Sequence, residues 1–157
     1  MKYFIALLVS CVLLVSNAVA QSTIFLVRHA EKAGGDDPDL TEAGHARAES
    51  LANILKDAGI TAIYTSEVKR TQQTAAPLAK ALHVEPAVIP AKDSAALVAK
   101  LKGSSGNALV VGHSNTIPEI IKALGITTPV NIADNDYDNL FLVVLEEKPR
   151  LVLLHYR

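Results

Sequence analysis

The chain has 157 residues, of which 50% are hydrophobic and 20% are charged, and its net charge is −1. This length allows one globular domain with its own core and is short for two. The balanced charge, the absence of Trp and the 4% aromatic content exclude the basic or stacking surfaces of nucleic-acid-binding proteins.

The first twenty residues are predicted to be a secretory signal peptide. Met1-Lys2 gives a positive start, an apolar run covers 3–15, and Ala18-Val19-Ala20 forms an A-x-A cleavage site. The run is short for a membrane span. An uncleaved anchor and lipidation at Cys11, which follows a loose lipobox, are the alternatives. We expect a mature domain over 21–157, located in a periplasm or secreted.

Removal of this segment takes away Lys2 and Cys11, so the net charge becomes about −2 and no cysteine remains. The mature domain therefore has no disulfides, no cysteine nucleophile and no thiolate metal site.

The apolar run T-I-F-L-V over 23–27 predicts a buried strand, and a Gly- and Asp-rich loop follows over 31–39. Thr41 caps a predicted helix that ends at Gly59. A second strand is expected over 61–65.

Next come a helix over 68–82 and a weaker strand over 83–89, which lies between prolines. A short helix over 94–101 precedes a very apolar strand over 108–111. A helix over 117–124 is the last one predicted.

The chain ends in two predicted strands, 140–145 and 151–155, whose short connection permits only an antiparallel hairpin. The strand–helix alternation before them predicts an α/β fold with three α/β/α layers and a mostly parallel sheet. We find no repeat, low-complexity tract or second domain.

Unusual polar residues follow two of the predicted strands. Arg28-His29 comes after 23–27, and Gly112-His113 comes after 108–111. Ligands of open α/β sheets bind at the carboxyl ends of strands. If these strands are neighbours, both imidazoles and the Arg28 guanidinium share a crevice that suits a dianion.

Arg70 adds a third element, because it falls in the first turn of the helix over 68–82. The free N–H groups and positive dipole of a helix start favour an anion, and a guanidinium can bind two phosphate oxygens. Arg28, Arg70, His113 and this helix start are thus expected to surround one phosphoryl group.

Four motifs occur in a fixed order: L-V-R-H-A-E, D-L-T-E-A-G, Y-T-S-E-V-K-R-T-Q-Q-T-A and V-V-G-H-S-N. With these motifs, over 23–126, the sequence resembles the histidine phosphatase superfamily, the phosphoglycerate-mutase-like proteins. The resemblance implies that His29 attacks phosphorus and becomes phosphohistidine. It implies that Arg28, Arg70 and His113 hold the transferring group, and that no metal or other cofactor is needed.

Attack requires a neutral His29, and a hydrogen bond from its other ring nitrogen to a backbone carbonyl would fix the tautomer. Nearby arginines disfavour the imidazolium. Ala30 stands where the family usually has Gly, a change that adds one methyl group.

The proton donor is not evident, because many members carry it in an insertion that this compact chain lacks. Asp93, after the third predicted strand, and Glu31, two residues beyond the nucleophile, are equal candidates, with Glu85 also nearby. Glu31 is alternatively expected to pair with Lys32 or Arg70. Ser114 stands where the acid-phosphatase branch has Asp, so that role does not transfer.

We therefore expect an exported phosphatase that acts on a phosphomonoester or a phosphoramidate. The substrate is a small phosphorylated compound or a phosphoprotein, and neither its identity nor the oligomeric state follows from the sequence. The alternatives are a catalytically weak protein that binds phosphate or a phospholigand, and a metal hydrolase built on His29, His113 and Asp93. The segment 134–139 is rich in oxygen ligands and is expected to be a solvated loop at the mouth of the site, without EF-hand spacing.

Overall fold

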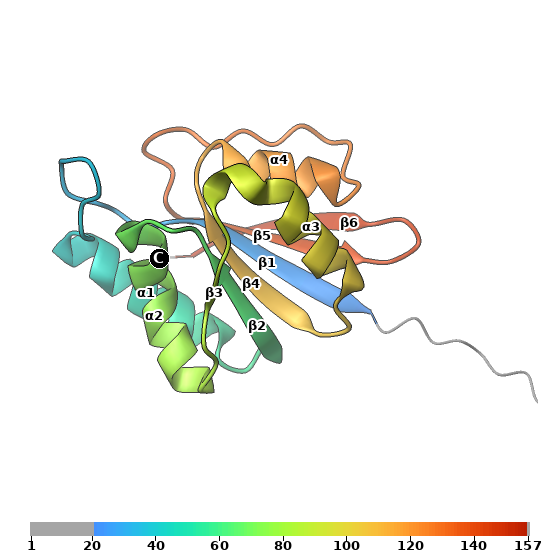
Figure 1. Ribbon diagram of the computed structural model, residues 1–157, viewed down its shortest axis with the longest axis horizontal. Helices are drawn as coiled ribbons and strands as arrows, with labels where there is room; N and C mark the ends of the chain where they lie inside the picture. The colour runs from blue at the N-terminus through green and yellow to red at the C-terminus, as the bar shows by residue number, and fades with distance from the viewer. Residues whose placement is uncertain (1–20, 157) are drawn as a thin grey trace, which may run out of the picture.

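Six strands form one sheet in the order β3-β2-β4-β1-β5-β6 (Figure 1). The computed structural model describes residues 21–156. The strands are β1 (Ser22–Arg28), β2 (Ile60–Thr65), β3 (Ala87–Val88), β4 (Asn107–Gly112), β5 (Asn139–Leu145) and β6 (Arg150–His155). The first four are mutually parallel, and β5 and β6 form an antiparallel hairpin beside β1. The predicted mostly parallel sheet and its terminal hairpin are confirmed.

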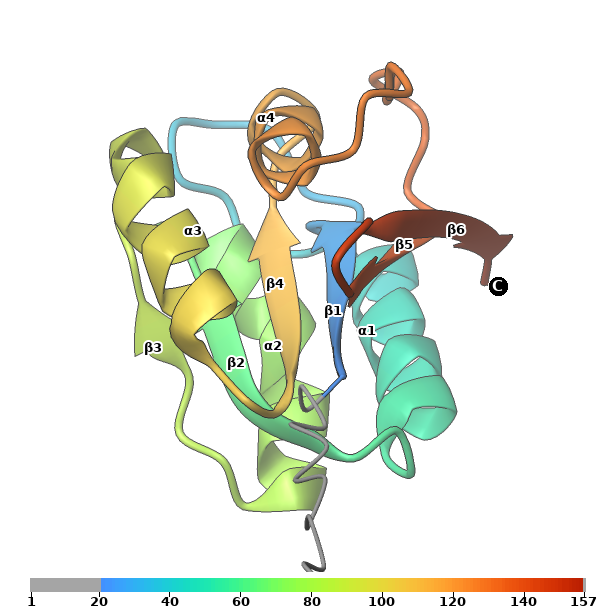
Figure 2. The same ribbon diagram turned by 90° about the vertical axis from the view of Figure 1, so that its right-hand side faces the viewer.

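Helices cover both faces of this sheet (Figure 2). They are α1 (Glu42–Leu55), α2 (Lys69–Leu82), a short 3-10 turn η1 (Ala91–Asp93), α3 (Ser94–Gly103) and α4 (Thr116–Ala123). Side chains of a strand alternate between faces. Val27 therefore packs in the cluster that contains Leu51 of α1 and Leu78 of α2, whereas Leu26 packs with the cluster of α3 and α4. The three predicted layers are confirmed.

The strands β1 and β4 are hydrogen-bonded neighbours, with Arg28 opposite Gly112. Their carboxyl ends therefore meet at one edge of the sheet, as the crevice expected from the sequence requires. The β2 end lies beside them, because β2 pairs with the other side of β4.

The third strand differs from its prediction. It comprises only Ala87–Val88 instead of 83–89. His83, the first residue of the predicted strand, instead caps the end of α2 in a left-handed conformation, with φ of 55°. Pro86 and Pro90, which lack an N–H, cannot donate to a sheet ladder and bound this short strand. Asp93 consequently lies in η1 and not at the end of a strand.

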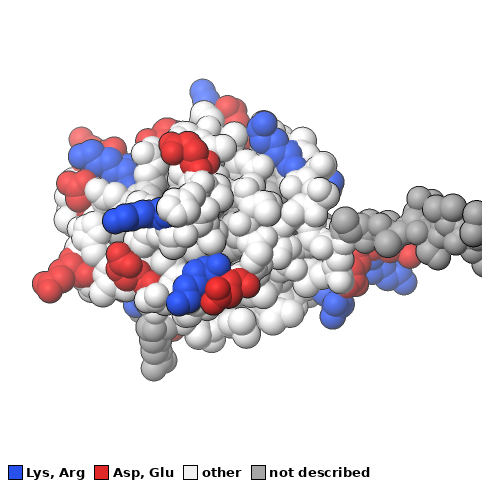
Figure 3. Space-filling model, turned by 90° about the horizontal axis from the view of Figure 1, so that it is seen from below, with Lys and Arg blue, Asp and Glu red and all other residues white. Residues whose placement is uncertain are grey.

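The predicted signal peptide, its alternatives and Cys11 lie outside the described residues. Within residues 21–156, no helix combines the length and apolar character needed to cross a membrane. Acidic and basic side chains are interspersed on the face drawn in Figure 3.

Candidate active site

His29 directly follows β1 and extends its pairing, because its backbone N–H donates to the Gly112 carbonyl at 2.9 Å. The residue is only 3% exposed. Its Nδ1 lies 2.8 Å from the carbonyl oxygen of Ala30 and donates to it, since a carbonyl only accepts. In the neutral ring this leaves the lone pair on Nε2, which is the tautomer expected from the sequence.

The surroundings of His29 keep it neutral. Burial lowers its pKa from 6.5 to about 4, and the positive field of Arg28, together with smaller contributions from His113 and Arg70, acts in the same direction. The Ala30 carbonyl opposes this shift because it favours positive charge on the ring. Burial, more than the arginines named in the sequence argument, is the largest cause.

Arg28 ends β1 and is buried. Its Nη1 donates to the carbonyls of Ala133 and Asp134, at 2.9 and 2.8 Å. The guanidinium carbon lies 4.4 Å from the ring centroid of Tyr137. The cation is therefore held beside His29 by the loop that precedes β5.

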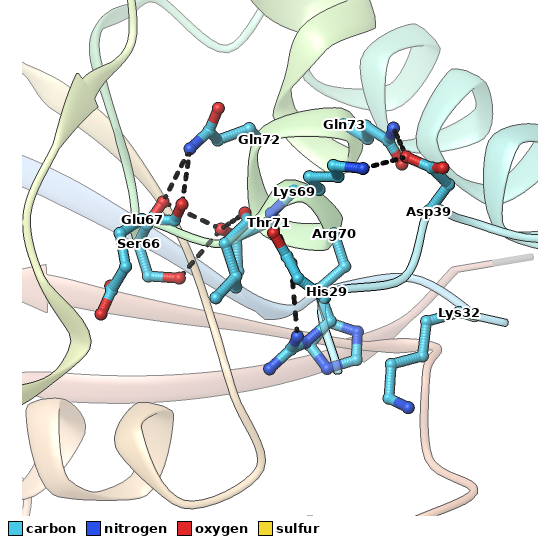
Figure 4. A network of polar contacts seen from close by, with 12 residues as sticks. His29, Lys32, Asp39, Ser66, Glu67, Lys69, Arg70, Thr71, Gln72 and Gln73 are labelled. Atoms are coloured by element: carbon cyan, nitrogen blue, oxygen red, sulfur yellow. Dashed lines mark hydrogen bonds and ion pairs between the residues drawn. The ribbon is translucent and has the colours of Figure 1, made fainter. Parts of the chain in front are cut away.

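Arg70 lies in the first turn of α2, as predicted, and Figure 4 shows it next to His29. Its Nη1 is 3.9 Å from the Asp37 carboxylate, which also accepts from the Lys69 backbone N–H at 3.0 Å. Thr74 links α2 to the segment that follows His29. Its hydroxyl donates to the Arg70 carbonyl and accepts from the Ala30 N–H.

His113 follows β4, and its ring centroid is 5.5 Å from that of His29. Burial lowers its pKa, with Arg70 acting in the same direction and Glu67 opposing. Its Nε2 is 3.1 Å from the Ser66 hydroxyl. The Ser66 hydroxyl is in turn 2.9 Å from the Thr71 hydroxyl, and Figure 4 shows these two side chains in contact.

This hydroxyl chain orients the His113 ring. Thr71 donates its single proton to backbone carbonyls, including that of Val68 at 2.9 Å. Ser66 therefore donates to Thr71 and accepts from Nε2–H of His113. The Ser and Thr of the T-S-E-V-K-R-T motif thus set which His113 nitrogen carries the proton.

A cleft of about 600 Å³ opens over these groups. It is lined by His29, Val68, Arg70, Ala91, Lys92, Ser94, His113, Ser114, Asn115, Thr116 and Glu119. Three of the four predicted core residues, His29, Arg70 and His113, therefore line one space, and Arg28 is the residue directly before His29. The arrangement provides an uncharged imidazole nucleophile and fixed cations for an anionic group.

The structure does not bring the two expected proton donors, Glu31 and Asp93, to this cleft. Glu31 forms a two-pronged ion pair with Arg47, with N–O distances of 2.7 to 2.9 Å. Burial would raise its pKa, but the Arg47 hydrogen bonds prevail and lower it. Asp93 is exposed, and its neighbours Lys92 and Ser94 line the cleft instead. The expected partners of Glu31, Lys32 or Arg70, are also incorrect.

Glu119, Lys92 and Tyr137 are site residues that the sequence analysis did not single out. Glu119 and Lys92 line the cleft from α4 and η1, and the Tyr137 ring packs against the Arg28 guanidinium. The one available signal was for Glu119, which sits in the first turn of the helix that follows Gly112-His113.

The D-L-T-E-A-G segment has a structural role beside the site. Thr41 caps α1 by accepting from the Gly44 N–H at 3.1 Å. A Cβ on Gly44 would lie 2.1 Å from the Glu31 carbonyl oxygen. Only glycine therefore lets the chain after the nucleophile pass this close to α1.

Within residues 21–156, His, Cys, Asp and Glu side chains form no group of three that could hold a metal ion. The metal hydrolase considered from the sequence consequently has no assembled ligand set among the described residues.

Comparison with known proteins places this geometry in a family. The model of the histidine phosphatase superfamily (branch 1) matches residues 24–92, which include Arg28, His29 and Arg70. Over these residues the chain matches the histidine phosphatase superfamily.

Curated proteins match between 34% and 40% of the chain. A 2,3-bisphosphoglycerate-dependent phosphoglycerate mutase of Bartonella tribocorum is 40% identical over 63 residues, which are 34% of this chain and 31% of the mutase. Phosphoserine phosphatase 1 of Hydrogenobacter thermophilus is 40% identical over 70 residues, which are 40% of this chain and 33% of that enzyme. The chain thus spans about a third of the length of these relatives.

Solved structures of superfamily members match most of the chain. The protein histidine phosphatase SixA complexed with tungstate has a TM-score of 0.68 at 22% identity, covering 85% of this chain and 96% of SixA. A phosphoserine phosphatase of Entamoeba histolytica in complex with 3-phosphoglyceric acid has a TM-score of 0.65 at 16% identity, covering 87% and 96%. These matches establish the histidine phosphatase fold over the part of the chain that includes His113.

Proposed function

We propose that this protein is an exported phosphatase that hydrolyses a phosphomonoester or a phosphoramidate through a phosphohistidine on His29. The observation that carries the proposal is the His29 ring, which donates from Nδ1 to the Ala30 carbonyl and has a pKa lowered to about 4. A neutral imidazole with a free Nε2, next to two guanidinium groups, is suited to attack a phosphate dianion.

In the first step, Nε2 of His29 attacks phosphorus, and the bond between phosphorus and the leaving oxygen or nitrogen breaks. The ring becomes positively charged because Nδ1 keeps its proton, and the Ala30 carbonyl, 2.8 Å away, stabilises that charge. Arg28 and Arg70 hold the phosphoryl oxygens and offset the charge that builds on them. His113 joins them once Nδ1 is also protonated, since its Nε2–H is bonded to Ser66.

In the second step, water attacks the phosphohistidine and gives a proton to the Glu119 carboxylate, which lost one to the leaving group in the first step. The bond between phosphorus and Nε2 breaks, inorganic phosphate leaves, and His29 returns to its neutral form. The His29 side chain is thus regenerated with Nδ1–H still bonded to Ala30.

We take Glu119 as the proton donor to the leaving group, in place of Asp93 and Glu31, because it is the carboxyl group that lines the cleft with His29. Removal of a general acid costs about 10²–10⁴-fold when the leaving group is poor. We expect Glu119→Gln to lose activity on alkyl phosphates by about 100-fold or more and on aryl phosphates and phosphoramidates much less.

The control for this test is Glu49→Gln, which removes an exposed carboxylate from α1, outside the cleft. An equal loss on good and poor leaving groups in Glu119→Gln would exclude the proton-donor role. It would leave substrates that need no acid, such as phosphoramidates, as the preferred class.

The decisive experiment for the nucleophile is to trap the phosphoenzyme with a reactive donor such as an aryl phosphate or a phosphoramidate. We expect an acid-labile phosphate on His29, a burst of released alcohol, and the loss of both in His29→Ala. Undiminished turnover in a folded His29→Ala variant would disprove this mechanism.

The alternative is a phosphate- or phospholigand-binding protein with little turnover, which is favoured by the position of Glu31 and Asp93 away from the cleft. Tight binding of inorganic phosphate without hydrolysis of a reactive aryl phosphate would support it.

The substrate is proposed to be a small phosphorylated compound or a phosphoprotein. The cleft is open to solvent beside η1 and α4, and the relatives include phosphatases named for phosphoserine and for protein histidine. Activity on phosphoserine and on a phosphohistidine-containing protein would separate these classes.

Export rests on the sequence of residues 1–20. Sequencing the amino terminus of the protein secreted by a bacterial host tests it, and a mature chain that starts at Gln21 is expected. Recovery of the intact amino terminus from the cytosol would contradict export.

A further inference from the structure

The loop before β5 holds Arg28, a residue more than a hundred positions away in the chain. Arg28 is only 7% exposed, so its guanidinium depends on partners inside the protein. Nη1 donates to two backbone carbonyls, those of Ala133 and Asp134. These two bonds fix the direction of the Arg28 side chain.

The turn that supplies these carbonyls is stabilised by its own hydrogen bonds. The Asp136 backbone N–H donates to the Ala133 carbonyl at 3.0 Å, and the Asp136 carboxylate accepts from the Ala133 N–H at 3.1 Å. The same Ala133 carbonyl thus serves both the turn and Arg28. The turn is a formed unit that presents its oxygens to the guanidinium.

Tyr137 follows this turn and contacts both Arg28 and the nucleophile. Its ring centroid is 4.4 Å from the guanidinium carbon of Arg28 and 6.2 Å from the ring centroid of His29. A cation held over an aromatic face is attracted to it, and more so where water is excluded. The ring therefore packs against two of the four groups of the site.

Tyr137 also leaves one side open for the substrate. The cleft reaches His29 from η1 and α4, and neither Arg28 nor Tyr137 lines it. The cleft therefore gives a phosphate access to His29 beside α4, and Tyr137 contacts Arg28 and His29 from outside the cleft lining.

We propose that Tyr137 is a positioning residue of the phosphatase site, which holds the Arg28 guanidinium toward the phosphoryl group and covers one side of His29. This inference rests on the proposed function. The ring, and not the hydroxyl, carries the role, since both contacts are made by the aromatic face or edge. The effect on phosphate is exerted through Arg28.

Three substitutions test the proposal: Tyr137→Ala removes the ring, Tyr137→Leu keeps an apolar side chain without the π face, and Tyr137→Phe removes only the hydroxyl. We expect Ala and Leu to weaken binding of inorganic phosphate by about 5- to 30-fold, which corresponds to a cation–π contact away from water. Tyr137→Phe should recover most of this loss. Thermal melting shows whether each variant is folded.

A second readout separates positioning from general packing. The pKa of His29, followed by NMR in the absence of substrate, should move up toward 6.5 in Tyr137→Ala, because water reaches the ring. Arg28, Arg70 and His113 also face His29 and remain in every variant. A purely structural role would change the melting temperature without moving this pKa.

Both readouts work without turnover, so they remain informative if the protein proves to bind phosphate without hydrolysing it. Failure of the phosphoenzyme trap in the wild type would count against the proposed function alone. Equal phosphate affinity and an unchanged His29 pKa in folded Tyr137→Ala would overturn the role of Tyr137 alone. If Tyr137→Ala does not fold, the comparison is made between the other two variants. Equal affinities of Tyr137→Leu and Tyr137→Phe for inorganic phosphate would then overturn the role of the aromatic ring.

Discussion

The Asp37 carboxylate lies 3.9 Å from Nη1 of Arg70 and accepts a hydrogen bond from the first N–H of α2. A protein carboxylate thus occupies the two features that would bind a phosphate, a helix start and a guanidinium. An incoming phosphate has to compete with it or share the site.

We predict that Asp37→Asn binds inorganic phosphate more tightly. Asn still accepts from the helix N–H, so the cap is kept while the competing charge is removed. Since Asp37 is half-exposed, we expect the inhibition constant for phosphate to fall by about 2- to 5-fold. Asp39→Asn is the control, because Asp39 pairs with Lys69 and Gln73 and not with Arg70. Equal effects of the two substitutions would show that only the net charge of the loop matters.

A second prediction concerns pH and the stability of the fold. His29 has a pKa of about 4 in the folded protein and 6.5 as the reference value. Between these values the unfolded chain binds more protons, so the contribution of His29 is present above pH 6.5 and is lost as the pH falls toward 4. The difference in free energy of unfolding between wild type and His29→Asn should shrink by about 3 kcal/mol across this window. Urea unfolding at pH 7.5, 5.5 and 4.5 measures it, and a constant difference would refute the shift.

A third prediction concerns Gly44, whose missing side chain lets the backbone at Glu31 approach α1. A Cβ there would meet the Glu31 carbonyl oxygen at 2.1 Å, so the backbone has to move in Gly44→Ala. We expect a loss of about 2–3 kcal/mol of stability, together with lower activity, because the displaced segment follows the nucleophile. Gly34→Ala is the matched control, since a Cβ at Gly34 meets nothing within 4 Å. Similar melting temperatures of the two variants would contradict this role of Gly44.

A fourth prediction separates Glu31 from proton transfer. Its carboxylate pairs with Arg47, and both side chains are mostly buried. We expect Glu31→Gln to lower the free energy of unfolding by about 1–2 kcal/mol, as for a charge-assisted hydrogen bond. Its relative activity on alkyl and aryl phosphates should stay as in the wild type. A selective loss on alkyl phosphates would restore Glu31 as the acid.

The pH dependence of this ion pair has a defined sign. The pKa of Glu31 is lowered on folding, so its stabilisation is present above the unfolded pKa and is lost as the pH falls through the folded one. The Glu31→Gln variant should therefore lose less stability than the wild type on acidification.

The sequence predicted the positions of Arg28, His29 and His113 because each lies at the end of a short apolar strand, and that of Arg70 because it begins a helix. Once β1 and β4 pair in parallel, the strand ends bring Arg28, His29 and His113 together. These local patterns and their order in the chain are sufficient to predict where the three side chains lie. The position of Arg70 is predicted by the start of α2, whose first turn contains it.

The carboxyl group that lines the cleft and the aromatic partner of Arg28 could not be predicted in the same way. Asp93 was misplaced because two prolines shorten β3 and leave the residue in a 3-10 turn. Glu31 pairs with Arg47 because of the orientation of α1 relative to the loop after β1. Tyr137 contacts Arg28 because of the path that an irregular loop takes before β5. Contacts of this kind depend on the packing of distant segments, which no local pattern encodes.

The start of β1 has a practical consequence. Residue 22 begins the strand and residue 28 ends it at the cleft, so the two ends are separated by about 20 Å along the sheet. A tag or tether joined ahead of Gln21 is therefore attached at the pole of the domain remote from His29. Protein immobilised through that terminus should keep the cleft beside His29 turned away from the support.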